Sequence, residues 1–176
     1  WVGTYHGGLN RFDGKRFVRY MHDPLDPASI PDNSVWEICE DSQGRFWVGT
    51  LRAGLATFDR KTGRFTRLGF GNQGFTRSAY LSAITEDHSG RVWFGTASGI
   101  ELLMPDGSFK LFSYRDGKAG ALSNDHVNGI IEDHRHRIWV ATRDGLNLYD
   151  ATNDTFRVFR MEDGLSDNTV MAVVED

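Results

Sequence analysis

The sequence predicts an all-β chain: a β-propeller built from four-stranded antiparallel blades of about 46 residues, with four blades' worth of strands present. Two observations predict this fold. Four tryptophans recur at equal spacings of 46 residues, at Trp1, Trp47, Trp93 and Trp139. Between them, short runs rich in β-branched and aromatic residues alternate with turns of Gly, Asp and Ser, which is typical of an antiparallel meander. A repeat of this length made of four short strands indicates a propeller blade.

The repeat divides the chain into units of similar layout. They begin near Trp1, Val35, Leu81 and Val127. The first strand of a further unit, the last strand in the chain, is expected at 170–176. We therefore treat residues 1–176 as a single propeller region.

Within the second unit, strands are predicted at 35–40, 45–50, 54–59 and 64–68. A loop at 69–80 leads to the next unit. No segment has a sustained helical period with capping residues, so helix is expected to be a minor component.

The first strand of each unit is apolar on both sides of its pleat, because its apolar residues lie three positions apart. The pairs are Val35 and Ile38, Leu81 and Ile84, Val127 and Ile130, and Val170 and Val173. These strands are expected to be deeply buried.

The repeated phrase D-x-x-G-R-x-W is predicted to be structural. Its Asp is expected to cap the hairpin between the first two strands through backbone N–H groups. Its Gly is expected to take positive φ, and its Trp to pack between adjacent blades. The residues assigned to this motif are Trp1, Trp47, Trp93, Trp139, Asp41, Asp87, Asp133, Gly44 and Gly90.

The third copy of the phrase departs from the other two. His136 stands where the others have Gly44 and Gly90, which leaves room for another turn type. Ala141 likewise replaces Gly49 and Gly95, the glycines expected to allow close backbone approach beside the Trp.

Composition excludes several classes of protein. A net charge of −4 and a pI near 5.9 give no overall attraction to nucleic acid. No apolar run approaches the roughly 20 residues that span a bilayer. The single cysteine, Cys39, cannot form an intramolecular disulfide and is expected to be a buried, inert thiol.

The whole unit, V-x-x-I-x-E-D-x-x-G-R-x-W-x-G-T-x-x-G-L-x-x-[FY]-D, with loops such as 22–34, resembles the two-component regulator propeller repeat. The resemblance covers all 176 residues. It implies the periplasmic or otherwise extracytoplasmic sensor portion of a bacterial signalling protein. Such sensors commonly lie upstream of a histidine kinase and sometimes of a diguanylate cyclase, and neither output domain is written in this sequence.

The strand count leaves two arrangements open. The last first strand could complete the blade begun at Trp1 and close a ring of four blades. We favour a fragment of a longer sensor, whose open edges would favour self-association or pairing with adjacent blades of the parent chain.

No catalytic, metal or cofactor site is predicted. The acidic pairs recur once per unit at the same turn, which indicates hairpin capping rather than a unique general acid. His134 and His136 are flanked by Arg135 and Arg137, whose charge would oppose a cation, so a solvated turn is expected there.

If a ligand binds, it should meet the loops that join the second to the third strand and the fourth strand to the next unit, because both emerge at one end of a blade. Arginine beside aromatic rings would suit a small polar molecule or an acidic glycan fragment, although an ordinary solvated rim is the competing interpretation. The residues selected are Tyr5, His6, Arg52, Tyr80, Arg143 and Asp144. Ser98, Phe75, Arg77, Arg115 and His126 lie on the same loops.

Trp36 falls outside the 46-residue spacing. It could line the central face of the propeller, but packing in the core is the favoured interpretation.

These observations favour a non-catalytic sensor or ligand-recognition propeller. A purely structural or dimerisation propeller is the alternative, and a propeller lyase or glycosidase has less support because no catalytic group stands out.

Overall fold

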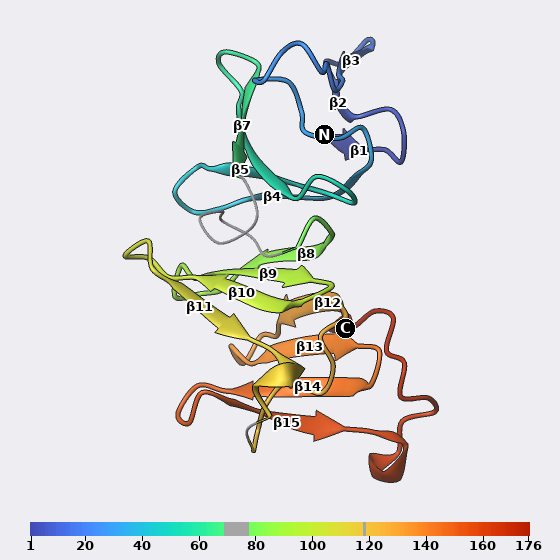
Figure 1. Ribbon diagram of the computed structural model, residues 1–176, viewed down its shortest axis with the longest axis vertical. Helices are drawn as coiled ribbons and strands as arrows, with labels where there is room; N and C mark the ends of the chain where they lie inside the picture. The colour runs from blue at the N-terminus through green and yellow to red at the C-terminus, as the bar shows by residue number, and fades with distance from the viewer. Residues whose placement is uncertain (69–77, 118) are drawn as a thin grey trace. The chain divides into compact units, whose positions relative to one another are not determined.

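The computed structural model describes residues 1–68, 78–117 and 119–176, and the chain divides into two compact units, Trp1–Ile84 and Thr85–Asp176 (Figure 1). Strands account for nearly all regular structure, as predicted. The helical elements in the described ranges are two short 3-10 turns, η1 (Tyr114–Asp116) and η2 (Met161–Asp163). No helix in those ranges is long and apolar enough to cross a membrane.

The first unit contains a three-stranded and a four-stranded antiparallel sheet. The smaller sheet has the order β1-β2-β3, formed by β1 (Val2–Gly3), β2 (Leu9–Phe12) and β3 (Phe17–Tyr20). The larger sheet has the order β4-β5-β6-β7, formed by β4 (Val35–Glu40), β5 (Phe46–Thr50), β6 (Leu55–Asp59) and β7 (Arg64–Leu68). The ends of the four strands of the larger sheet lie within one residue of the predicted ends.

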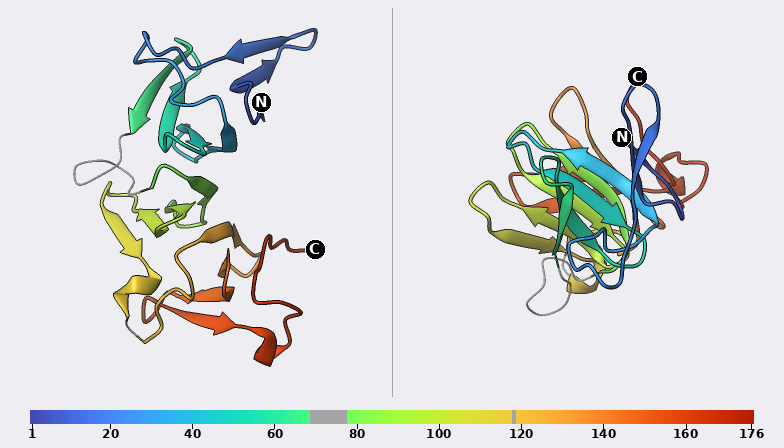
Figure 2. Two further views of the ribbon diagram at one scale, coloured as in Figure 1. Left: turned by 45° about the vertical axis from the view of Figure 1, so that its right-hand side comes forward. Right: turned by 90° about the horizontal axis from the view of Figure 1, so that it is seen from above.

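Two further four-stranded sheets follow, and Figure 2 shows them from two other directions. The first has the order β11-β10-β9-β8, formed by β8 (Leu81–Glu86), β9 (Val92–Thr96), β10 (Gly99–Leu103) and β11 (Phe109–Phe112). The second is formed by β12 (Val127–Glu132), β13 (Ile138–Thr142), β14 (Gly145–Asp150) and β15 (Thr155–Phe159). β12 packs against β9. Consecutive strands pair in chain order in every sheet, which is the meander of a propeller blade and confirms the predicted fold class.

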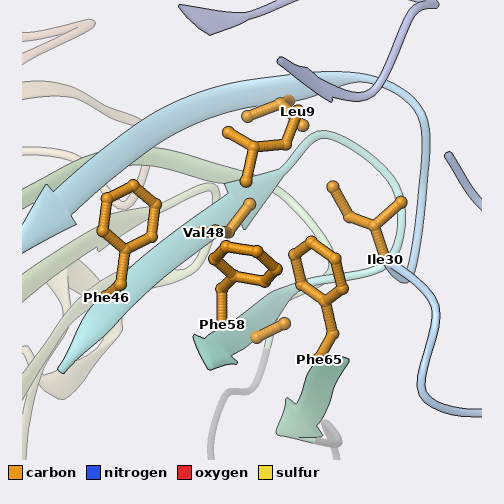
Figure 3. Packing of buried hydrophobic residues seen from close by; sticks show 8 residues of the cluster. Leu9, Ile30, Phe46, Val48, Phe58 and Phe65 are labelled. Carbon is orange, nitrogen blue, oxygen red and sulfur yellow. The ribbon is translucent and has the colours of Figure 1, made fainter. Parts of the chain in front are cut away.

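An apolar cluster joins the two sheets of the first unit (Figure 3). Trp1 packs its ring against Phe46 and Phe58 of the next sheet, at centroid distances of 5.1 and 5.3 Å. The buried members of the cluster are Leu9, Ile30, Val35, Phe46, Val48, Ala56, Phe58 and Phe65. Burying each of the larger side chains contributes roughly 1.5–3 kcal/mol, so this contact between successive sheets is a main source of the unit's stability.

Trp93 has the same role in the second unit. Its fully buried ring stacks on Phe112 of its own sheet, at 6.1 Å and 9°, and meets Tyr149 of the next sheet edge-on at 5.0 Å. The predicted position between adjacent blades is therefore correct for this tryptophan.

The strand predicted at 170–176 is not formed. The Val170 N–H donates to the Thr142 carbonyl at 2.9 Å, and the Asn128 side chain donates to the Val170 carbonyl at 2.8 Å. These bonds hold the start of the segment beside β12 and β13. A ladder requires a partner strand along the whole segment, and the described residues supply none.

Trp36 is also not where it was predicted. It lies at a β-bulge in β4, between Val35 and Glu37, where the register with β5 shifts. A bulge re-aims the side chain of the extra residue, and Trp36 is 52% exposed instead of packed in the core. Cys39, predicted to be buried, is half-buried.

Each repeat has a glycine before the first apolar residue of its third strand, as in Gly99-Ile100, and a steric contact explains why this residue is glycine. Gly99 has a φ of 104°, and a Cβ built on it would lie 2.2 Å from the Phe112 carbonyl oxygen. Gly8 and Gly145, at the equivalent positions, show the same close approach to the last residue of the neighbouring strand. Only glycine fits a contact of this kind at positive φ.

Replacing Gly99 by alanine should therefore destabilise the second unit by roughly 1–3 kcal/mol from backbone strain alone, with the carbonyl contact adding to that cost. Gly107→Ala is the matched control, because Gly107 also has positive φ (86°) but its Cβ would meet nothing within 4 Å. Urea unfolding of both variants separates strain from steric contact. Equal destabilisation by the two substitutions would show that the close approach to Phe112 does not matter.

Candidate functional site

A buried carboxylate organises the first hairpin of each complete sheet. Asp41 Oδ2 accepts from the Trp47 indole Nε1–H at 2.8 Å and from the Arg45 Nε–H at 2.5 Å. Its Oδ1 accepts the backbone N–H groups of Gln43 and Arg45 at 3.1 and 2.8 Å. The predicted hairpin capping is thus present. The indole and guanidinium bonds were not predicted, because residue spacing alone does not show where a side chain turns.

The same arrangement recurs twice. Asp87 accepts from Trp93 and Arg91 side chains at 2.7 and 2.6 Å, and Asp133 accepts from Trp139 and Arg137 at 2.8 and 2.6 Å. In every copy the arginine also lies over the tryptophan ring. We call this group of three side chains the Asp-Arg-Trp cluster.

In the third copy of the cluster the electrostatics favour an ionised carboxylate. Burial acts to raise the pKa of the Asp133 carboxyl, but the hydrogen bonds from Trp139 and Arg137 outweigh it and hold that pKa well below its ordinary value. Both oxygens of each Asp accept bonds from the fold itself, so these recurring carboxylates are poor candidates for acid–base catalysis.

The third hairpin keeps the turn of the other two, so the different turn type left open for it is not used. His136 has a φ of 60°, beside 78° for Gly44 and 74° for Gly90. Its N–H donates to the Asp133 carbonyl at 2.8 Å, as the two glycines do to their own Asp. Asp133 accepts the backbone N–H groups of Arg135, His136 and Arg137, and these three bonds impose the turn. His136 therefore adopts a left-handed backbone that glycine would take without strain.

A threonine stabilises the turn between the second and third strands of each four-stranded sheet, at the end opposite the Asp-Arg-Trp cluster. Thr50, Thr96 and Thr142 are fully buried, and their hydroxyls donate to Gly54, Gly99 and Gly145 carbonyls at 2.8, 2.9 and 3.0 Å. This explains the Thr that ends each W-x-x-T phrase. The sequence contained the signal, in the regular recurrence of Thr after Trp, but the residue was not singled out.

In the first unit, three backbone hydrogen bonds gather the predicted binding loops at one end of the sheets. Val35 N–H donates to Thr4 O at 3.0 Å, Leu51 N–H to Ser34 O at 3.1 Å, and Gly54 N–H to Ala79 O at 2.9 Å. The residues beside these bonds include four selected from the sequence. They are Tyr5, His6, Arg52 and Tyr80.

Trp36 joins the same end of the first unit, because it follows Val35 directly and is 52% exposed. Tyr5 is 55% exposed and its ring contacts His6 at 4.2 Å. We call Tyr5, His6, Trp36, Arg52 and Tyr80 the loop face of the first unit. It combines exposed aromatic rings with an arginine that has no ion-pair partner among the described residues.

Arg143 and Asp144 lie in the second unit. Asp144 is occupied by an ion pair with Arg160 at 2.9 Å. The Arg143 N–H donates to the His126 carbonyl at 3.2 Å. Burial, and then the charge of Arg143, lower the pKa of His126 below its ordinary value. Four of the six selected residues therefore gather in one unit, and these two form a separate group.

Several other predicted loop residues do not contribute to these groups. Phe75 and Arg77 lie outside the described residues. Arg115 pairs with Asp125 at 3.1 Å. A pocket of about 330 Å³ lies beside β11 and the β14–β15 turn, and another of about 400 Å³ lies beside β5 and β6. Neither is lined by a residue predicted to bind a ligand.

Known proteins resemble this chain at the level of repeat and fold. The sequence model of a protein family described as two component regulator propeller matches residues 29–52, 75–98 and 121–144. A solved structure from B. thetaiotaomicron, assigned as the extracellular domain of a hybrid two-component system, aligns with a TM-score of 0.75 and 29% identity. That alignment covers 89% of this chain and 21% of the other protein, so this chain spans about a fifth of its length. No curated protein matches the sequence.

More distant structures share the fold alone. Virginiamycin B lyase from Staphylococcus aureus aligns with a TM-score of 0.61 and 17% identity, over 88% of this chain and 48% of the lyase. PorZ, a surface component of the type-IX secretion system of Porphyromonas gingivalis, aligns with a TM-score of 0.50 and 17% identity, over 97% and 34% of the two chains. Three stretches of this chain thus match the two-component regulator propeller repeat, and each covers the first two strands of one of the four-stranded sheets.

Proposed function

We propose that this chain is the ligand-recognition part of an extracytoplasmic bacterial sensor, which binds its signal without turnover. The observation that carries the proposal is the 29% identity with a protein assigned as the extracellular domain of a hybrid two-component system. In such a system the propeller would pass a conformational bias across the membrane to an output domain elsewhere in the parent protein. A periplasmic location and a histidine kinase output belong to the same proposal.

The loop face of the first unit is the proposed recognition surface. It stands on the hydrogen-bonded ends of packed strands, so its side chains are presented by a rigid base. Trp36 and Tyr5 offer exposed rings for stacking, and Arg52 offers a bidentate donor. These groups suit a polar ring-shaped ligand that carries a carboxylate, such as an acidic sugar.

Binding without turnover is supported by the way the carboxylates are used. Asp41, Asp87 and Asp133 are each saturated by indole, guanidinium and backbone donors. The lyase of known structure shares the propeller fold at 17% identity, a level that carries no information on activity.

The test is a thermal-shift and calorimetric screen of the purified chain against acidic and neutral oligosaccharides. An acidic ligand should raise the unfolding temperature, and Trp36→Ala and Arg52→Glu should each weaken its binding by about tenfold or more, equivalent to about 1.4 kcal/mol. Both side chains are exposed, so stability should stay within about 0.5 kcal/mol of the parent.

Arg19→Glu is the matched control for charge. Arg19 is exposed on β3 and has no ion pair among the described side chains, so its reversal changes net charge without touching the loop face. Equal loss of binding in Arg19→Glu and Arg52→Glu would point to a general charge effect. Binding by none of the sugars, together with self-association of the chain, would favour a structural or dimerisation role. Release of cleaved sugar would favour an enzyme.

A further inference from the structure

Two imidazoles and a carboxylate meet at neighbouring hairpins of the second unit. His88 comes from the β8–β9 turn, His136 from the β12–β13 turn, and Glu132 from the end of β12. Their potential ligand atoms all lie within 4.8 Å of one another. Glu132 Oε1 contacts His88 Nδ1 and lies 3.5 Å from His136 Nδ1, and the two imidazole rings lie 4.1 Å apart. One carboxylate oxygen thus faces both imidazoles.

Each of these side chains is oriented by further contacts. The other ring nitrogen of His88, Nε2, lies 3.1 Å from the Ser89 hydroxyl. Glu132 Oε2 accepts the His88 backbone N–H at 2.8 Å, which leaves Oε1 directed at the rings. His136 is held by the left-handed turn that Asp133 imposes. Metal-binding imidazoles characteristically have their second nitrogen engaged in this way.

The flanking arginines, which argued against a cation in the sequence, are directed to other partners. The Arg137 guanidinium bonds Asp133 and lies over the Trp139 ring. Arg135 Nε–H donates to His134 Nε2 at 3.3 Å. Neither guanidinium is directed at the cluster of His88, Glu132 and His136. The charge of these arginines is therefore no argument against a cation there.

We propose that His88, Glu132 and His136 form a binding site for a divalent transition metal ion, with Zn²⁺ the best match. Two imidazoles and one carboxylate are a ligand set that zinc uses when a fourth position is left to water or substrate. Ligand atoms of a tetrahedral zinc ion lie about 3.3 Å apart, given bond lengths of about 2.0–2.2 Å. The 3.5 Å between His136 Nδ1 and Glu132 Oε1 already fits this edge, and the ion would take the place of the direct contact between His88 Nδ1 and Glu132 Oε1.

Among the residues that the structure describes, the cluster arises once, because two positions of successive repeats must both be histidine. In the turn of the first complete sheet, Ser42 and Gly44 occupy the positions of His88 and His136. At the next step along the chain, His134 contacts Glu175 with no second imidazole beside it in the described residues. Sequence spacing missed the site because its ligands come from successive repeats, with Glu132 and His136 lying 44 and 48 residues after His88. A bound ion would link two blades.

The probe is Zn²⁺ itself, titrated calorimetrically into chelator-treated, untagged protein. We expect an ion bound per chain at this cluster and a higher unfolding temperature with zinc present, because an ion that binds only the folded state stabilises it. His136→Gly should weaken binding by about tenfold or more, since losing even an outer-shell partner costs a metal site about 10–100-fold. Glycine is the residue the turn prefers, so this variant should fold.

Two further variants sharpen the test. Ser89→Ala leaves all three ligands in place and should weaken zinc binding by roughly tenfold, as expected of a positioning residue. His134→Ala removes an imidazole from the neighbouring turn and should leave the affinity unchanged. A cobalt-substituted protein should gain an absorption band that His136→Gly lacks. Absence of zinc binding to the parent protein, or equal weakening by His134→Ala and His136→Gly, would overturn the proposal.

Discussion

Replacing Asp87 by alanine is expected to lower the free energy of unfolding by about 3–5 kcal/mol, the cost of breaking a buried ion pair by removing one partner. The Asp87 side chain is fully buried, and the Arg91 side chain it pairs with is 18% exposed. The substitution also leaves the Trp93 indole N–H and the backbone N–H groups of Ser89 and Arg91 without their acceptor. Each unsatisfied buried donor adds to the penalty.

Asp87→Asn and Asp106→Ala separate the contributions. Asparagine keeps the shape and one acceptor oxygen but loses the charge, so its effect should fall between the parent and the alanine variant. Asp106 also caps a hairpin, accepting from the Ser108 N–H at 2.9 Å and hydroxyl at 2.6 Å, but that turn is exposed. Its replacement should leave the urea midpoint near that of the parent. If Asp87→Ala shifted the urea midpoint as little as Asp106→Ala, the Asp-Arg-Trp cluster would act only as an ordinary turn cap.

Much of the fold could be predicted because repetition multiplies a weak signal. A single run such as V-W-E-I-C-E is ambiguous, but four strands recurring with Trp at a 46-residue spacing leave few alternatives. The ends of the strands predicted between residues 35 and 68 were correct to within one residue because Asp and Gly mark the turns between them.

Side-chain direction was predictable only in part. The Asp of the repeat was recognised as a cap, yet its bonds to Trp and Arg depend on rotamers that spacing does not specify. Packing of Trp36 in the core was the favoured interpretation, but a one-residue bulge at Trp36 shifts the register of β4, and the side chain is 52% exposed. His136 left room for another turn type, but the three hydrogen bonds that the Asp133 carboxylate accepts from Arg135 and Arg137 outweigh the strain of one positive φ.

The candidate site was predictable to the level of loops. Alternation of strands and turns indicates which loops share one end of a blade, and backbone bonds bring Tyr5, Arg52 and Tyr80 to one end of the first unit. Contacts between successive sheets, such as that of Glu132 with His88, have no sequence signature of their own. They depend on the packing of one sheet on the next.

Trp93→Ala is expected to cost about 3–5 kcal/mol, because a fully buried indole leaves a cavity that its neighbours can fill only in part. The ring supports Phe112 within its own sheet and Tyr149 in the next, so the cavity opens between two sheets. Its indole N–H also bonds Asp87 at 2.7 Å. Trp93→Phe keeps most of the ring and removes that bond, and should cost about 1–3 kcal/mol, the penalty for a buried group left without a partner.

Trp36→Ala is the matched control, the same substitution at a tryptophan that is 52% exposed and outside the 46-residue spacing. It should change the free energy of unfolding by no more than about 0.5 kcal/mol. Chemical denaturation followed by circular dichroism measures all three variants without relying on the fluorescence of the residue removed. If Trp36→Ala and Trp93→Ala destabilise equally, the tryptophan repeat does not mark the contacts between blades. A large difference between them would show that the 46-residue spacing selects the side chains that hold successive blades together and leaves Trp36 free for the loop face.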